Sequence, residues 1–242
     1  MPIAIATEDG TCPAHVFTPS TLGPWPGVLF YMDGIGIRPA LFAMGERMAA
    51  AGYYVLLPDL FYRGGPYPPM DPAKLFTDPE VRAAWFKKFA SAASVEQIMR
   101  DTRAFLAHFD AQSDVKPGKR GVTGYCMGGK MSLCAAGHFP DAFAAAASYH
   151  GGSLATDAPD SPHLLAPQMK ARVYVAGAIE DANFTDEQKQ RLETALTDAN
   201  VEHTIETYPA KHGWVPSDTP VHDAAQAERH WTTLLELFGR SL

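Results

Sequence analysis

The chain has 242 residues, 46% of them hydrophobic and 19% charged, which is enough to bury the core of one α/β domain spanning residues 1–242. Its formal net charge of −7 argues against nucleic acid or an anionic membrane as the main partner. The sequence has no stretch of about 18 apolar residues, and its N-terminus lacks the pattern of a signal peptide. Its three cysteines do not have the spacing of metal ligands. We therefore expect a cytoplasmic protein without cofactor or metal, present as a monomer or a small homo-oligomer.

The first part of the chain predicts a short antiparallel start followed by a strand-helix-strand unit. Residues 2–7 ("PIAIAT") and 14–19 ("AHVFTP") predict two strands separated by the break "EDGTCP". The run "PGVLFYMDGIG" (26–36) is continuously apolar before its acid and glycines, a pattern typical of strands covered on both faces. Helical spacing over 39–52 and a second buried strand at 53–60 complete the unit.

The same alternation continues to the C-terminus and predicts a doubly wound, mostly parallel sheet with helices on both faces. Residues 61–74 are rich in Pro and Gly and predict a long loop of functional importance. Ligands in such sheets bind beyond the carboxyl ends of the strands. The remaining predicted elements are helices at 79–90, 93–111, 127–139, 184–199 and 221–238, strands at 120–125, 142–151, 171–178 and 202–209, and loops at 151–168 and 210–220.

The stretch "GYCMG" at 124–128 lies between a predicted strand and a predicted helix. This is the context of a nucleophile elbow, in which flanking glycines permit a tight turn that lifts the nucleophile above the sheet edge. The positive end of the following helix favours a thiolate at Cys126. The pentapeptide alone leaves two readings open, because a free cysteine is commonly a small buried residue.

Chain order favours the nucleophile. In hydrolases with such an elbow the nucleophile is followed by an acid and then a histidine, each after a strand. Asp181, or its neighbour Glu180, follows the strand at 171–178, and His212 follows the strand at 202–209. We prefer Asp181 to Glu180 as the acid. His150 ends a strand at the same edge, but it precedes the acid and is the second choice as general base.

Three further residues lie at this sheet edge. Asp33 closes the strand "GVLFYM" (27–32) and either faces the crevice, or caps the following helix or holds a loop. The backbone N–H groups of Gly34 and of Met127, directly after the cysteine, are suited to form an oxyanion hole.

With these residues in place, the chain resembles the dienelactone hydrolase family of α/β-hydrolases. The similarity covers almost the whole chain and includes "YMDGIGI", "YYVLLPDLFYR", "GYCMGG" and "KHGW". The resemblance implies an α/β-hydrolase fold and a triad of Cys126, Asp181 and His212. It also implies that Asp33 stands where the family has a thiol-activating glutamate.

The family uses two arginines to hold a substrate carboxylate. Arg82 falls in the region of one, and Pro216 stands in place of the other. We therefore expect neutral esters and lactones to be better substrates than those with a free carboxylate. Tyr125, Trp214 and His150 are further candidates for substrate binding.

The predicted activity is hydrolysis of a small-molecule ester or lactone through a thioester on Cys126. One alternative is a catalytically weak α/β-hydrolase-like protein that binds a small molecule. A cysteine-based redox sensor is a third possibility, but no resolving cysteine lies near Cys126, since Cys134 falls inside the next helix.

Overall fold

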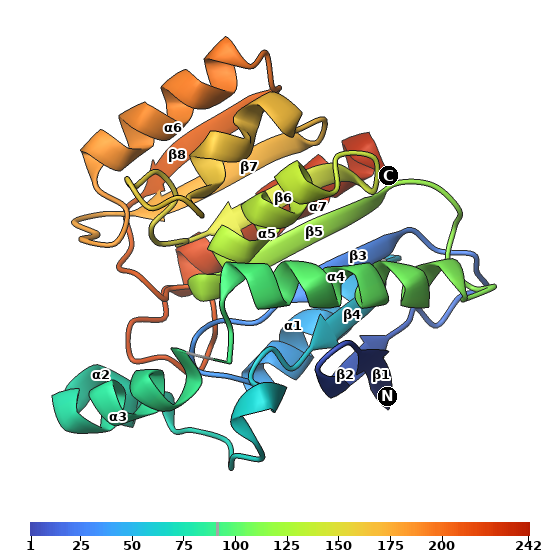
Figure 1. The fold of residues 1–242 in the computed structure, drawn as a ribbon, viewed down its shortest axis with the longest axis horizontal. Coiled ribbons are helices and arrows are strands. Elements are labelled where there is room, and N and C mark those ends of the chain that lie inside the picture. The colour runs from blue at the N-terminus through green and yellow to red at the C-terminus, as the bar shows by residue number, and fades with distance from the viewer. Residues whose placement is uncertain (91) are drawn as a thin grey trace.

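The computed structural model describes residues 1–90 and 92–242, which fold around an eight-stranded sheet (Figure 1). The strands are β1 (Pro2–Thr7), β2 (Gly10–Phe17), β3 (Gly27–Tyr31), β4 (Tyr54–Pro58), β5 (Arg120–Tyr125), β6 (Phe143–Tyr149), β7 (Arg172–Ala178) and β8 (His203–Tyr208). They lie in the order β1-β2-β4-β3-β5-β6-β7-β8. The β1-β2 and β2-β4 pairs are antiparallel and all the others are parallel, as the sequence predicts.

Helices cover both faces of this sheet. They are α1 (Pro39–Ala50), α2 (Pro72–Thr77), α3 (Pro79–Ala90), α4 (Val95–Asp110), α5 (Met127–His138), α6 (Asp186–Asp198) and α7 (Ala224–Ser241), with 3-10 turns η1 (Tyr62–Gly64) and η2 (Pro162–Gln168). Figure 1 shows α4, α5 and α6 in front of the sheet and α1 and α7 behind it. The helices α2 and α3 stand apart from the sheet at the lower left of the view.

The central strands bring the candidate residues to one edge of the sheet. Every residue of β3, β4 and β5 is buried, which explains their continuous apolar runs. Tyr31 of β3 lies opposite Gly124 of β5, and Tyr125 lies opposite Tyr149 of β6. Because these parallel strands end at the same level, the loops that follow them meet at one edge.

Two details of the sequence prediction are wrong. The break "EDGTCP" is too long, because β2 begins at Gly10 and Thr7 pairs with Gly10 across a two-residue turn. Pro13 lies inside that strand, where its carbonyl accepts a hydrogen bond from the N–H of Asp59. The loop at 61–74 contains η1 and the start of α2, whose first turn is capped by the side chain of Asp71.

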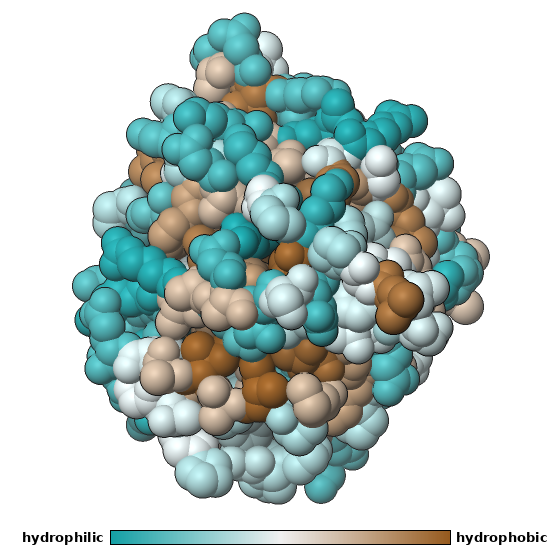
Figure 2. Space-filling model, turned by 90° about the vertical axis from the view of Figure 1, so that its right-hand side faces the viewer, coloured by the Kyte–Doolittle hydropathy of each residue, from teal (hydrophilic) through white to brown (hydrophobic). Residues whose placement is uncertain are grey.

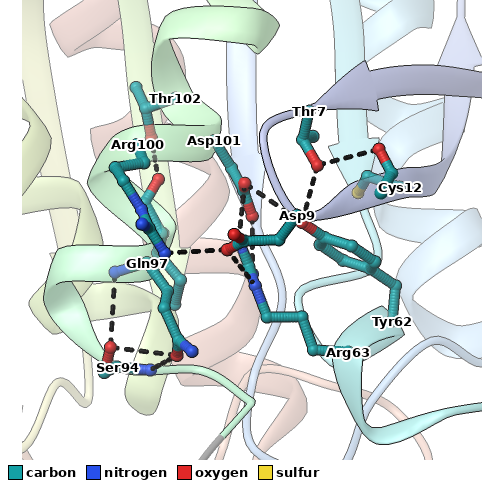
Figure 3. Close-up of polar contacts among 12 residues, drawn as sticks. Thr7, Asp9, Cys12, Tyr62, Arg63, Ser94, Gln97, Arg100, Asp101 and Thr102 are labelled. Atoms are coloured by element: carbon teal, nitrogen blue, oxygen red, sulfur yellow. Dashed lines mark hydrogen bonds and ion pairs between the residues drawn. The ribbon is translucent and has the colours of Figure 1, made fainter.

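A partly buried arginine, Arg63, fixes η1 against the rest of the molecule (Figure 3). Arg63 donates to both carboxylate oxygens of Asp101 on α4, at 2.8 and 2.7 Å, and to Asp9 in the β1-β2 turn at 2.8 Å. Asp101 is almost fully buried, so its charge requires this partner. The chain is thereby anchored before it enters α2 and α3.

The opposite end of the sheet, where the parallel strands begin, faces the viewer in Figure 2. Hydrophobic residues gather in the lower half of that face, among hydrophilic ones. Among the described residues, no helix is long and apolar enough to cross a membrane.

Candidate active site

Cys126 lies in a sharp turn between β5 and α5. Its φ of 54° and ψ of −116° form a strained conformation for a residue with a side chain. A Cβ on Gly124 would collide with the carbonyl of Gly128, and a Cβ on Gly128 would collide with the carbonyls of Tyr31 and Met32. Only glycine therefore fits at both flanking positions, and this turn has the form of the predicted nucleophile elbow.

The three cysteines have different environments. Cys126 is half-buried and lines a pocket, whereas Cys12 and Cys134 are fully buried in the core. Burial raises the pKa of Cys134 to about 12 and also raises that of Cys12. Both core thiols therefore stay protonated at neutral pH, which makes them poor nucleophiles.

The backbone of Cys126 is held by the end of β6. Its N–H lies 3.1 Å from the carbonyl oxygen of Tyr149 and 3.1 Å from Nδ1 of His150, and both accept. Burial, together with the nearby His212, lowers the pKa of His150 well below its usual range. His150 is therefore neutral, and its Nδ1 is free to accept a hydrogen bond from the elbow.

His212 and Asp181 form a hydrogen-bonded pair beside the thiol. Nδ1 of His212 donates to Oδ2 of Asp181 at 2.7 Å. The other carboxylate oxygen accepts from the backbone and the side chain of Asn183, at 2.9 and 3.1 Å. Because these donors outweigh the effect of burial, the pKa of Asp181 is lowered, so it remains ionised.

The pKa of His212 depends on the neighbouring Cys126. Burial lowers the pKa of His212, but the negative charge of Cys126 and the bond to Asp181 oppose this effect. The net result is a pKa raised to about 10. Below this pH, His212 carries a positive charge next to the side chain of Cys126.

The structure separates the two acids that the sequence left as alternatives. Asp181 is buried and bonded to His212, whereas Glu180 is exposed and has a positive φ of 51°. The turn at Glu180 directs the next residue, Asp181, toward the histidine. The preferred acid is therefore the one that meets His212.

A pocket of about 640 Å³ opens above these residues. Cys126, His212 and His150 are among the residues that line it. Its walls combine apolar residues with charges near the opening, namely Ile35, Leu75, Phe76, Phe86, Met127, Arg82 and Lys130. A small organic ester fits such a cavity, since pockets of this kind bury most of a ligand's surface against apolar walls.

The two expected oxyanion donors both line this pocket. Met127 is the first residue of α5, where backbone N–H groups have no acceptor within the helix. Among the described residues, Gly34 N–H donates no hydrogen bond, and the Gly34 carbonyl accepts from Nε1 of Trp85 on α3 at 2.9 Å. Both N–H groups are thus available to a ligand.

Asp33 lines the pocket, but its carboxylate is engaged by other groups. Its two oxygens accept from Nη1 and Nη2 of Arg38 at 2.8 and 2.9 Å, and one also accepts from the N–H of Ile35. Both carboxylate oxygens of Asp33 are thus engaged by Arg38 and Ile35, and its role in activating the thiol stays a prediction. No pattern in the sequence indicates that Arg38 pairs with Asp33.

Two of the four expected substrate-binding residues, Tyr125 and Trp214, lie away from the pocket, whereas His150 and Arg82 line it. Tyr125 is fully buried behind the elbow, with its hydroxyl 2.7 Å from Nε2 of His230 on α7. Trp214 is also fully buried and stacks on Tyr208. Neither is among the residues that line the pocket. Arg82 does line it, as an exposed residue of α3.

Sequence reasoning missed part of the pocket wall. Leu75 and Phe76 come from α2, part of which falls in the stretch predicted as loop, and Lys130 comes from the first turns of α5. No local pattern marks these residues, because their place depends on how α2 and α5 pack around the elbow. Phe86 of α3 also lines the pocket.

Similarity to known proteins extends over nearly the whole chain. A protein of Synechocystis named "Putative carboxymethylenebutenolidase" is 25% identical over 99% of this chain and 96% of its own. An Escherichia coli K12 protein of the same name is 26% identical over 97% of this chain and 84% of its own.

Solved structures match the fold at lower identity. The Klebsiella pneumoniae protein described as "Putative Dienelactone Hydrolase" has a TM-score of 0.85 and 22% identity, covering 99% of this chain and 97% of its own. A promiscuous, dienelactone hydrolase-like phosphotriesterase from metagenomic libraries has a TM-score of 0.76 and 21% identity, covering 100% and 98%. These likenesses establish the α/β-hydrolase fold. The family model "Dienelactone hydrolase family" matches residues 12–242, so the chain belongs to this family and is a hydrolase of esters or lactones.

Proposed function

We propose that this protein hydrolyses small esters or lactones with a catalytic triad of Cys126, His212 and Asp181. The observation that carries the proposal is the pair of His212 and Asp181, 2.7 Å apart, beside a cysteine whose charge raises the pKa of the histidine. A nucleophile, a base and a group that orients the base are the components that acyl transfer requires.

In the first step, His212 holds the proton of Cys126 and the thiolate attacks the carbonyl carbon. The carbonyl π electrons move to oxygen, and the N–H groups of Gly34 and Met127 stabilise the resulting oxyanion. When the tetrahedral intermediate collapses, the C–O bond to the leaving group breaks. His212 gives its proton to the departing alcohol or enol, and the acyl group remains on Cys126 as a thioester.

In the second step, His212 takes a proton from water, and the water oxygen attacks the thioester carbonyl. A second oxyanion forms in the same hole, and the C–S bond breaks to release the carboxylic acid and restore the thiolate. Because sulfur leaves more readily than an amine, attack on an amide returns mainly to substrate. Activated esters, enol-lactones and thioesters therefore suit this site better than peptides.

The pocket favours a neutral, apolar acyl group. Pro216 offers no cation, and Lys130 is paired with Asp160 at 2.9 Å. Arg82 is exposed at the opening, so water screens its charge. Phe76 and Phe86 instead provide aromatic surface close to the thiol. We assign the substrate class to neutral aryl or alkyl esters and lactones.

The proposal is tested by p-nitrophenyl acetate turnover in three single variants. Cys126→Ala should abolish turnover, and prior alkylation of the wild type with iodoacetamide should do the same. Cys12→Ala and Cys134→Ala are matched controls that should keep activity, because both residues lie in the core away from the pocket. A protein whose Cys126 alkylates normally but that turns over no ester or lactone would instead be a binding protein.

A further inference from the structure

Arg38 is a buried arginine that joins two loops around the pocket. Its side chain is only 2% exposed. It donates to both oxygens of Asp33, and it also donates to both oxygens of Asp218 through Nε and Nη2, at 2.8 and 3.2 Å. Asp33 precedes the oxyanion donor Gly34, and Asp218 lies on the loop that follows His212. One guanidinium therefore bridges the oxyanion loop (residues 33–38) and the histidine loop (residues 212–223).

Each end of this bridge is bonded to the neighbour of a catalytic group. At one end, Asp33 accepts from the N–H of Ile35 at 2.9 Å, which fixes the backbone on both sides of Gly34. At the other end, Thr219 Oγ1 donates to the carbonyl of Gly213 at 2.8 Å. The residue after Asp218 is thus tied to the residue after His212.

An arginine side chain is suited to hold the oxyanion loop and the histidine loop at a fixed distance from each other. Its planar guanidinium presents donors in a rigid fork, so two bidentate carboxylates are held in fixed directions. Because Arg38 and Asp33 are both buried, water does not compete for the bonds between these two residues. Lysine would supply the charge without the fork.

We propose that Arg38 and Asp218 are positioning residues that hold the oxyanion loop against the histidine loop, so that Gly34 N–H points to where the oxyanion forms. This inference rests on the proposed function of the site. Neither residue is among those that line the pocket in the described part of the chain, so both act through Gly34. The loop that supplies His212 thereby also sets the oxyanion hole.

The chain contains a matched control for this bridge. Arg63 also pairs bidentately with a buried aspartate, Asp101, and also reaches a second aspartate, Asp9 (Figure 3). Asp9 and Asp218 have side chains that are each 31% exposed. The Arg63 cluster joins η1, α4 and the β1-β2 turn, and its residues do not line the pocket.

The experiment compares Asp218→Asn with Asp9→Asn through two rates. The first is kcat for p-nitrophenyl acetate, which needs the oxyanion hole. The second is alkylation of Cys126 by iodoacetamide, which needs the thiolate but forms no oxyanion. In Asp218→Asn we expect kcat to fall about tenfold, less than the roughly 10²- to 10³-fold of deleting an oxyanion donor. KM and the alkylation rate should stay unchanged, because the hole acts only in the transition state.

Two further results complete the test. Asp218→Glu restores the carboxylate and should recover most of the lost kcat, whereas Asp9→Asn should keep the kcat of the wild type. The proposal is overturned if Asp218→Asn keeps the wild-type kcat. It is also overturned if kcat and alkylation fall together in Asp218→Asn, since that pattern marks damage to the Cys126–His212 pair or to the fold.

Failure of this inference is distinguishable from failure of the proposed function. If Cys126→Ala still hydrolyses the ester, the triad is wrong, whatever the bridge variants do. If Cys126→Ala is inactive and Asp218→Asn is fully active, the triad stands and only the positioning role is lost.

Discussion

Two regions of the molecule line the pocket. One consists of the loops that follow the parallel strands, and the other consists of the helices α2 and α3. The loops are fixed by hydrogen bonds and buried ion pairs, including His212–Asp181 and Arg38–Asp33. The two helices contribute aromatic rings: Phe76 lies where a Cβ on Gly213 would meet it, and Phe86 lies where a Cβ on Gly34 would meet it. These rings are 37% and 44% exposed. We infer that the loops determine the chemistry and that the helices determine which substrates enter.

The largest expected loss of activity comes from a substitution in the loops. His212→Ala removes both the base and the acid of the mechanism, so we expect kcat/KM to fall by roughly 10³ or more, since triad members act as a unit. Ester hydrolysis under pseudo-first-order conditions measures it. A variant that keeps a tenth of the wild-type rate would remove His212 from the mechanism.

The next effect separates two adjacent acids. Asp181→Asn should lower kcat by about 10² to 10⁴, because His212 loses the carboxylate that orients it and stabilises its positive charge. Glu180→Gln is the matched control and should behave as wild type, since Glu180 is exposed. Equal losses in the two variants would contradict the assignment of Asp181.

A third effect concerns pH. The pKa of His212 is raised to about 10, so the imidazolium is present below this pH and is lost as the pH rises through it. Activity should therefore persist into the alkaline range and then decline about tenfold per pH unit above pH 10. A blank-corrected pH profile of kcat/KM tests this. An alkaline limb near pH 7 would show that the charge of Cys126 does not stabilise the imidazolium.

Substitutions in the helices should have smaller effects, confined to substrate binding. Phe86→Ala removes aromatic surface worth about 1.5 to 3 kcal/mol when buried by a ligand, but part of this ring stays exposed, so we expect KM for an aryl ester to rise about tenfold at most. Iodoacetamide alkylation of Cys126 should be unchanged. If kcat falls instead and KM stays constant, Phe86 acts on the oxyanion loop through Gly34.

The smallest effect concerns the charge of the substrate. We expect the methyl ester of a lactone acid to be hydrolysed a few-fold faster in kcat/KM than the free acid. The apolar walls disfavour a carboxylate, and a pair with the exposed Arg82 offsets this by only about 0 to 1 kcal/mol. Competition between the two compounds measures the ratio directly. A strong preference for the acid would assign a carboxylate-binding role to Arg82 or Lys130.

The sequence predicted best what depends on local patterns. Continuous apolar runs marked the buried strands, and the residues that follow them, Cys126, Asp181 and His212, meet at one edge because parallel strands end together. Side-chain direction was harder to predict. Every residue of β5 is buried, so alternation cannot reveal that Tyr125 points away from the pocket toward α7.

Contacts between distant segments were not predictable from one sequence. The Arg38–Asp218 pair joins residues 180 positions apart, and neither residue lies in a motif. Phe76 lies on a short helix that begins within a Pro-rich stretch, where composition indicates a loop. In both cases the decisive information is tertiary packing, which periodicity and spacing do not encode.

Mass spectrometry of enzyme quenched in acid during p-nitrophenyl acetate turnover tests the central claim most directly. The account predicts a burst of p-nitrophenolate and one acetyl group per chain, found on the peptide that contains Cys126 and removed by hydroxylamine, as expected of a thioester. The same treatment of Cys126→Ala should give neither burst nor adduct. A stable adduct on another residue, or full turnover by Cys126→Ala, would contradict nucleophilic catalysis by Cys126.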